Sequence, residues 1–205
     1  MLTGKKIVLG VSGGIAAYKM ANVASMLSKL HADIHVVMTE NATHFITPET
    51  FEVLTGNHCY TDTFDRCMEL HVPHIALGTQ ADAILIAPAS ADVVGKIANG
   101  IADDMLTTCV LPATCPVMLA PSMNVHMYEN PIVQDNMKRL ASYGYEIIEA
   151  DEGYLACRDI GKGKLPPEHV LVDYIIRACA MDKDLAGKKV LVTAGATQES
   201  ILPVE

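Results

Sequence analysis

The sequence predicts an α/β fold, a Rossmann-like (flavodoxin-like) doubly wound parallel sheet with helices on both faces. Short apolar runs alternate with helical stripes along most of the chain, and this alternation is typical of βαβ units. The runs are almost continuously hydrophobic, which indicates strands that are buried on both faces. Ligands of such sheets bind beyond the carboxyl ends of the strands, so the segments 10–15, 87–92 and 120–128 are where we expect a site.

In the first half, the apolar stripe Ala17, Ala21, Ala24 and Leu27 predicts a helix. Thr47 and Pro48 are typical of a helix start, and Gly56 of a helix end. Residues 57–73 show no clean period. The predicted elements are a strand at 6–10, a helix at 15–30, a strand at 33–38 and a helix at 47–56.

In the second half, Pro88 and Pro121 end two further strands. Residues 151–166 hold several glycines and no period, which indicates a loop or flap. The predicted elements are strands at 83–87, 117–120, 146–149 and 189–193, helices at 89–99, 104–111, 130–144 and 167–180, and a charged linker at 182–189.

Composition excludes several classes of protein. The chain has 205 residues, of which 50% are hydrophobic and 19% charged, so global disorder is excluded. Its net charge of -9 repels phosphodiester backbones, so we expect no nucleic-acid partner. No apolar run approaches the ~20 residues of a membrane span, and no signal peptide precedes Gly13. The expected location is the cytoplasm, with no membrane partner.

The cysteines form no C-x-x-C pair, so we expect thiols, most of them core residues. Cys67, His71 and His74 form a C-x3-H-x2-H cluster, but no fourth ligand is evident, and we expect no metal. The histidines then have two readings, as surface or packed residues, or, for His74, as a catalytic group.

The segment from Gly10 to Ile15 joins the first strand to the first helix. Its glycines Gly13 and Gly14 and the hydroxyl of Ser12 suit a phosphate cradle at a helix N-terminus, although a tight turn explains them too. The second strand ends in Thr39 without the carboxylate that holds a dinucleotide ribose, which favours a mononucleotide such as FMN.

Two later strand ends carry polar side chains. After Pro88, either Ser90 or Asp92 can cap a helix, or Ser90 can face a cofactor. After Pro121, the amide of Asn124 can bind a ligand between methionines, or the segment can be a plain helix start.

The glycine-rich segment 153–164 carries one thiol, Cys157, and three cations, Arg158, Lys162 and Lys164. Cations on a loop of an acidic protein favour an anionic substrate. A solvated surface loop is the alternative.

Taken in order, these segments resemble the homo-oligomeric flavin-containing cysteine decarboxylases, and among them the phosphopantothenoylcysteine decarboxylases. The resemblance rests on these segments: Ser12-Gly13-Gly14-Ile15-Ala16-Ala17-Tyr18-Lys19, His74, Ala87-Pro88-Ala89-Ser90-Ala91-Asp92, Pro121-Ser122-Met123-Asn124 with Met127-Tyr128, and Ala156-Cys157. The chain departs from the family's usual residues at Asp92, Val93, Ser122, Tyr128 and Arg158.

The resemblance implies FMN as cofactor and a phosphorylated, cysteine-containing small molecule as substrate. FMN-binding residues would be Ser12, Gly13, Gly14, Ile15, Thr39, Ser90, Ala91, Asp92 and Ser122. Asn124 would grip the substrate carboxylate, with Met127, Arg158, Lys162 and Lys164 as further substrate contacts. His74 and Cys157 would be catalytic, Cys157 as the proton donor.

The implied reaction converts N-(4'-phosphopantothenoyl)-L-cysteine to 4'-phosphopantetheine in coenzyme A biosynthesis. Oxidation of the thiol creates an electron sink, CO2 leaves, and the resulting enethiolate is reduced and protonated. The alternatives are a peptidyl-cysteine decarboxylase, which stops at the enethiol, and a non-catalytic flavin-binding regulatory protein of the same fold.

The resemblance also implies a division of the chain and an assembly. Residues 1–181 would form the decarboxylase domain, and residues 182–205 a linker and the truncated start of a synthetase domain that follows in bifunctional proteins. The mean hydropathy of +0.25 indicates apolar surface buried between subunits. The resemblance specifies a homotrimer, possibly a dodecamer.

Overall fold

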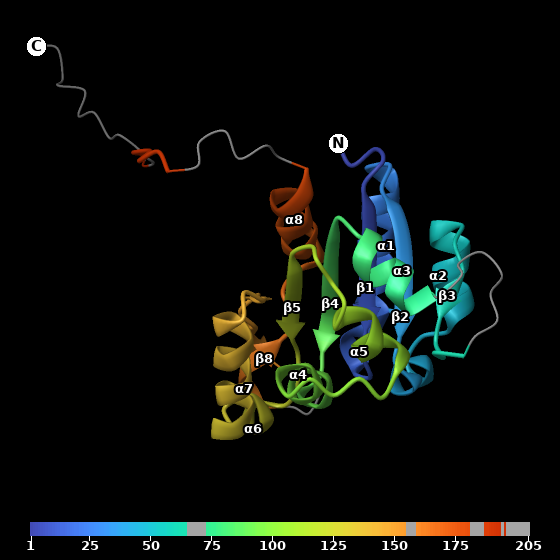
Figure 1. Ribbon diagram of the computed structural model, residues 1–205. Coiled ribbons are helices and arrows are strands. Elements are labelled where there is room, and N and C mark those ends of the chain that lie inside the picture. The colour runs from blue at the N-terminus through green and yellow to red at the C-terminus, as the bar shows by residue number, and fades with distance from the viewer. Residues whose placement is uncertain (65–72, 155–158, 181–186, 194, 196–205) are drawn as a thin grey trace, which may run out of the picture.

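The computed structural model describes residues 1–64, 73–154, 159–180, 187–193 and 195. Within them, six parallel strands form one sheet in the order β3-β2-β1-β4-β5-β6, which is the Rossmann strand order (Figure 1). This confirms the predicted fold class. The strands are β1 (Lys6–Val11), β2 (Asp33–Met38), β3 (Cys59–Tyr60), β4 (Ala83–Ala89), β5 (Val117–Pro121) and β6 (Glu146–Ile147).

Helices cover both faces of the sheet, and the side chains of β4 alternate between the two resulting cores. Leu85 packs in the core that includes residues of α1 and α8, whereas Ile84 and Ile86 pack in the core that includes residues of α3, α4, α5 and α7. The helices are α1 (Lys19–Lys29), α2 (Pro48–Thr55), α3 (Pro73–Gln80), α4 (Ala91–Ala98), α5 (Met105–Val110), α6 (Val125–Tyr128), α7 (Pro131–Ser142) and α8 (Glu168–Cys179), with the short 3-10 helices η1 (Ile15–Tyr18) and η2 (Glu40–His44).

Most predicted elements are present. The short elements η2, β3 and α3 lie in segments for which no element was predicted. β3 has two residues, too few for a periodic pattern. α3 contains Pro73 and Gly78 and lacks a clear apolar stripe, because Leu77 and Gly78 bury one face while Ile75 is about half exposed. Its packing against α5 therefore determines the helix more than its own pattern does.

Two sequence predictions are wrong. Within residues 151–166, where we expected a loop, β7 (Asp151–Tyr154) and β8 (Ile160–Lys164) form an antiparallel hairpin. The inner side of β8 consists of glycines, so the segment lacks the alternation of apolar and polar residues that predicts a strand. The strand expected at 189–193 is absent, since the described part of that segment is irregular and Leu191 is 91% exposed. An apolar strand forms only against a partner strand, and none pairs with it among the described residues.

Gly78 provides a test of this packing. A Cβ at Gly78 would lie 2.3 Å from the carbonyl oxygen of Cys109, so α3 and α5 can approach only with glycine there. We expect Gly78→Ala to lower the free energy of unfolding by about 2 kcal/mol, in the range of overpacked cores. Gly95→Ala in α4 is the matched control, because a Cβ there meets only Asn136 Nδ2 at 3.7 Å. Urea unfolding monitored by circular dichroism should show loss for the first variant and none for the second.

The described residues contain no helix that is both long enough and apolar enough to cross a membrane.

Candidate functional site

A cavity of about 290 Å³ lies at the carboxyl edge of the sheet, where β1, β4 and β5 end. It occupies the switch point between β1 and β4, from which the strand order runs in opposite directions. Among the described residues, twelve line it: Gly13, Gly14, Ile15, Ala16, Pro88, Ser90, Ala91, Ser122, Met123, Asn124, Met127 and Gly163. All three segments that were expected to hold the site therefore contribute to one cavity.

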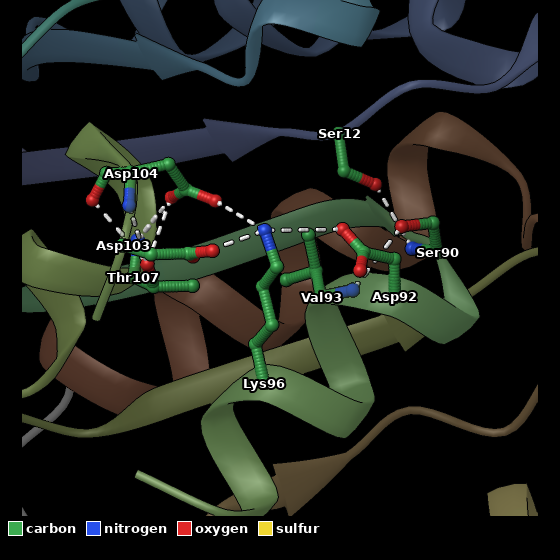
Figure 2. A network of polar contacts seen from close by, with 8 residues as sticks. All are labelled: Ser12, Ser90, Asp92, Val93, Lys96, Asp103, Asp104 and Thr107. Carbon is green, nitrogen blue, oxygen red and sulfur yellow. Dashed lines mark hydrogen bonds and ion pairs between the residues drawn. The ribbon is translucent and has the colours of Figure 1, made fainter. Parts of the chain in front are cut away.

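The hydroxyl of Ser12 joins the ends of β1 and β4. It is fully buried, donates to the carbonyl oxygen of Pro88 at 2.7 Å and accepts from the backbone N–H of Ser90 at 2.9 Å. Ser90 in turn caps α4, with its hydroxyl accepting from Val93 N at 3.3 Å. Figure 2 shows Ser12, Ser90 and Val93 side by side. Ser12 thus fixes the two loops relative to each other, and its hydroxyl does not line the cavity.

The glycine loop has open space for a side chain at Gly14 but not at Gly13. A Cβ at Gly13 would lie 2.5 Å from the Cβ of Asn41, so a side chain there would clash. At Gly14 the backbone is extended, and the nearest atom to a Cβ would be Pro88 Cγ at 4.0 Å. A phosphoryl group can therefore approach this backbone closely, at the point where the helical segment η1–α1 begins.

Thr39, like Gly14, has a feature that fits a bound ligand. Its backbone N–H donates to the carbonyl oxygen of Val11, which places it beside the end of β1. Its hydroxyl is buried and has no hydrogen-bond partner among the described residues. A buried hydroxyl without a partner is costly. A cofactor bound along this edge of the sheet would supply one.

Asn124 uses both ends of its side-chain amide. Its Oδ1 caps α6 by accepting from His126 N at 2.9 Å, and its Nδ2 donates to the carboxylate of Asp159 at 2.9 Å. The helix-start reading of this segment is therefore correct, and the amide also lines the cavity. The donor end of the amide meets a carboxylate.

The hairpin is fixed to the loop that carries Asn124. Met123 N and Ser122 Oγ donate to the carbonyl oxygen of Gly163, at 3.0 and 3.2 Å. A Cβ at Gly163 would lie 2.3 Å from the carbonyl oxygen of Met123, and one at Gly161 would lie 2.7 Å from Val125 Cγ2. These two glycines allow β8 to form one wall of the cavity.

The carboxylate of Asp92 turns away from the cavity. It lies 3.5 Å from Lys96, which also pairs with Asp103 and Asp104 at 3.0 and 3.2 Å (Figure 2). The hydrogen bond that Lys96 donates to Asp103 is the largest of the causes that raise the pKa of Lys96 above its usual value, against the effect of burial. Lys96 therefore stays charged and is shared among these three carboxylates. An anionic ligand at Ser90 would meet the backbone rather than this carboxylate.

His74 lies in the first turn of α3 and does not line the cavity. Its Nδ1 is buried and has no hydrogen-bond partner among the described residues. The opposite end of α3 is fixed near the start of β1, where Lys6 donates to Gln80. His74 therefore lies toward the carboxyl edge of the sheet, on the face that α3 covers.

The structure brings together eight of the predicted site residues: Gly13, Gly14, Ile15, Ser90, Ala91, Ser122, Asn124 and Met127. Ser12, Thr39, Asp92, His74, Lys162 and Lys164 do not line the cavity, and both lysines are exposed. Cys157 and Arg158 lie outside the described residues. The lining residues Ala16, Pro88, Met123 and Gly163 were not predicted as site residues, although all four belong to segments that the sequence singles out.

The cysteine prediction is confirmed for two thiols. Cys59 and Cys109 are buried in the two cores, and burial is the first cause that raises the pKa of each thiol to about 12. They are therefore protonated at neutral pH and poor nucleophiles. Cys67, like Cys157, lies outside the described residues.

Comparison with known proteins extends this picture. The flavoprotein family model matches residues 1–180. The coenzyme A biosynthesis bifunctional protein CoaBC of Bacillus subtilis is 47% identical over 206 residues, covering 100% of this chain and 51% of that protein. The CoaBC protein of Haemophilus influenzae is 41% identical over 203 residues, covering 99% of this chain and 51% of that protein. The chain thus spans about half the length of these relatives.

Solved structures share the fold. A PPC decarboxylase mutant complexed with pantothenoylaminoethenethiol superposes with a TM-score of 0.75 and is 29% identical, over 83% of this chain and 96% of that one. The FMN-dependent cysteine decarboxylase SpaF superposes with a TM-score of 0.70 and is 34% identical, over 85% of this chain and 99% of that one.

Proposed function

Because the chain belongs to the flavoprotein family, we propose that it is an FMN-dependent phosphopantothenoylcysteine decarboxylase, which converts N-(4'-phosphopantothenoyl)-L-cysteine to 4'-phosphopantetheine. The observation that carries the proposal is the cavity itself. It combines an open glycine loop with an amide that already holds a carboxylate. The identity to CoaBC proteins along the whole chain supports the choice of substrate.

The residues at the switch point fit FMN. Its phosphate would lie on the loop Gly13–Ile15 beside Ser90, and the unpartnered hydroxyl of Thr39 would gain a hydrogen bond. The Asp92 carboxylate pairs with Lys96, which stays charged near this site. Bound FMN would supply the electron acceptor that thiol oxidation needs, and would return the electrons at the end of the cycle.

The chain's own side chains then bind and shield the substrate. Asn124 would donate to the carboxylate that leaves as CO2, because its Oδ1 is held at the helix cap and only its NH2 group faces a ligand. Met123 and Met127 line the same cavity and would exclude water from the reacting carbon. The exposed lysines Lys162 and Lys164, with Arg158, would attract the anionic substrate from outside the cavity.

We extend the proposal to the assembly and to the rest of the chain. A homotrimer, possibly assembled further into a dodecamer, would cover apolar side chains that this chain exposes beside the loop, among them Ile15 at 58% and Tyr18 at 54%. Light scattering on the purified protein tests this, and a flavin-bound monomer would contradict it. Residues 1–181 would form the decarboxylase domain and residues 182–205 a linker and the start of a synthetase domain. The match of the family model to residues 1–180 supports this boundary.

His74 and Cys157 are proposed as catalytic residues that act in different half-reactions. We expect His74→Asn to reduce CO2 release by about a hundredfold, the usual size of an acid–base contribution. Cys157→Ala should still release CO2, but should accumulate an unsaturated product two hydrogens short, because the proton donor is lost. Rapid-quench mass spectrometry separates the two variants. Formation of 4'-phosphopantetheine at the parent rate by Cys157→Ala would exclude Cys157 as the donor.

The experiment that tests the proposed function is turnover with 4'-phosphopantothenoylcysteine, with the product identified by mass. A peptidyl-cysteine decarboxylase would instead release CO2 together with two hydrogens, and a non-catalytic flavin protein would leave the substrate unchanged. The same substrate without its phosphate serves as a comparison. A large loss of affinity for it would support the role of the cations Arg158, Lys162 and Lys164.

A further inference from the structure

The amide of Asn124 has a fixed orientation. A side-chain amide can exchange its oxygen and nitrogen by rotation, and only its hydrogen bonds decide between the two positions. Here the backbone N–H of His126 requires an acceptor, which is Oδ1 at 2.9 Å. The carboxylate of Asp159 requires a donor, which is Nδ2 at 2.9 Å. Asn124 therefore presents N–H groups to its surroundings, and it already holds a carboxylate.

The position of Asp159 follows from the way β8 packs. Gly163 accepts two hydrogen bonds from the Ser122–Met123 segment, and neither Gly161 nor Gly163 has space for a Cβ against residues 123–125. Asp159 directly precedes β8, so its position is tied to the same contact. Its hydrogen bond to Asn124 lies at the cavity, where Asn124 and Gly163 are both lining residues.

We propose that the Asp159 carboxylate is an internal occupant of the carboxylate subsite on Asn124, and that a ligand enters this subsite by exchanging for Asp159. The inference rests on the proposed function, in which the substrate carries a carboxylate. Two carboxylates at one amide repel each other, so the substrate and Asp159 occupy it in turn. Asp159 is thus a specificity-determining residue, because a ligand with its own carboxylate replaces the broken hydrogen bond with one of the same kind.

The exchange has a consequence for the reaction. Loss of CO2 removes the group that competes with Asp159, so Asp159 can bind Asn124 again once decarboxylation has occurred. The product then receives no hydrogen bond from Asn124, and its release is favoured over that of the substrate. The amide therefore discriminates between substrate and product without holding the product.

The test uses two unreactive ligands. One is the serine analogue of the substrate, which has the carboxylate but a hydroxyl in place of the thiol, and the other is the same compound without its carboxylate. Calorimetry on the flavin-loaded protein measures both. We expect Asp159→Ala to bind the carboxylate analogue about five- to tenfold more tightly, the equivalent of about one hydrogen bond. The dissociation constant of the analogue without a carboxylate should change by less than about twofold.

Two controls separate exchange from general electrostatics. Glu129→Gln removes an exposed carboxylate from the end of α6 without touching the amide, and should leave both affinities unchanged. In an Asn124→Ala background, Asp159→Ala should bring no further gain, because the hydrogen bond between Asn124 and Asp159 is already absent. A gain that persists in that background, or that is equal for both ligands, would overturn the exchange.

Two further results would contradict the exchange or the proposed function. Weaker binding of the carboxylate analogue by Asp159→Ala would show that Asp159 supports the ligand rather than competes with it, and would overturn the proposal. If Asp159→Ala does not fold, Asp159→Asn replaces it, with a smaller gain expected because its amide oxygen still accepts. Failure of the parent protein to bind the carboxylate analogue would overturn the proposed function, whereas binding without any dependence on Asp159 would overturn the exchange alone.

Discussion

Replacing Asn124 by aspartate should abolish turnover, by about a thousandfold or more, while the protein stays folded and yellow. Aspartate keeps the acceptor that caps α6 through His126 N, so the helix start survives. It loses the NH2 group, and its negative charge would face both the substrate carboxylate and Asp159. When a site is built around one hydrogen bond to the substrate, loss of that bond reduces the rate by a large factor.

Asn130→Asp is the matched control for this prediction. Asn130 caps α7 in the same way, with Oδ1 accepting from Ile132 N at 2.9 Å, but it does not line the cavity. Steady-state kinetics and flavin absorbance should therefore show a normal enzyme for Asn130→Asp and an inactive flavoprotein for Asn124→Asp. Normal activity of Asn124→Asp would mean that this residue is only a helix cap.

Gly14→Asp should remove the bound flavin entirely and with it all activity. The backbone of Gly14 is extended and a Cβ fits without a clash, so the substitution places a carboxylate in the cavity without disturbing the fold. That charge would lie against the FMN phosphate. Gly14→Asn is nearly the same size and uncharged, so it should retain much more flavin. Absorbance of the purified proteins and reconstitution of the apoprotein with FMN measure both variants, and equal loss would point to steric exclusion instead.

The central strands could be expected from the sequence because each is a short apolar run that ends at glycine, threonine or proline. The hairpin β7–β8 could not be, since the inner side of β8 consists of Gly161 and Gly163 and shows no hydrophobic alternation. The reason for these glycines lies in another segment, in the carbonyl oxygen of Met123 and the side chain of Val125. Contacts of this kind have no local signature.

The sequence predicted those site residues that also belong to a turn or cap a helix. Gly13, Gly14, Ser90 and Asn124 were singled out as ligand residues, and the cap readings of Ser90 and Asn124 hold as well. Sequence reasoning could not foresee that the Ser12 hydroxyl is used between two loops, because its partner lies at Pro88. Nor could it foresee the ion pair of Asp92 with Lys96, which holds this carboxylate away from the cavity.

The most direct test of the account is the mass balance of the reaction. The purified protein, reconstituted with FMN, is incubated with 4'-phosphopantothenoylcysteine in the absence of oxygen or any other electron acceptor. The mass of the product is then measured by mass spectrometry. The account predicts many turnovers per flavin and a product that has lost CO2 alone, because the electrons taken from the thiol are returned to the product. Unchanged substrate, or a product that has lost CO2 and two hydrogens, would contradict it.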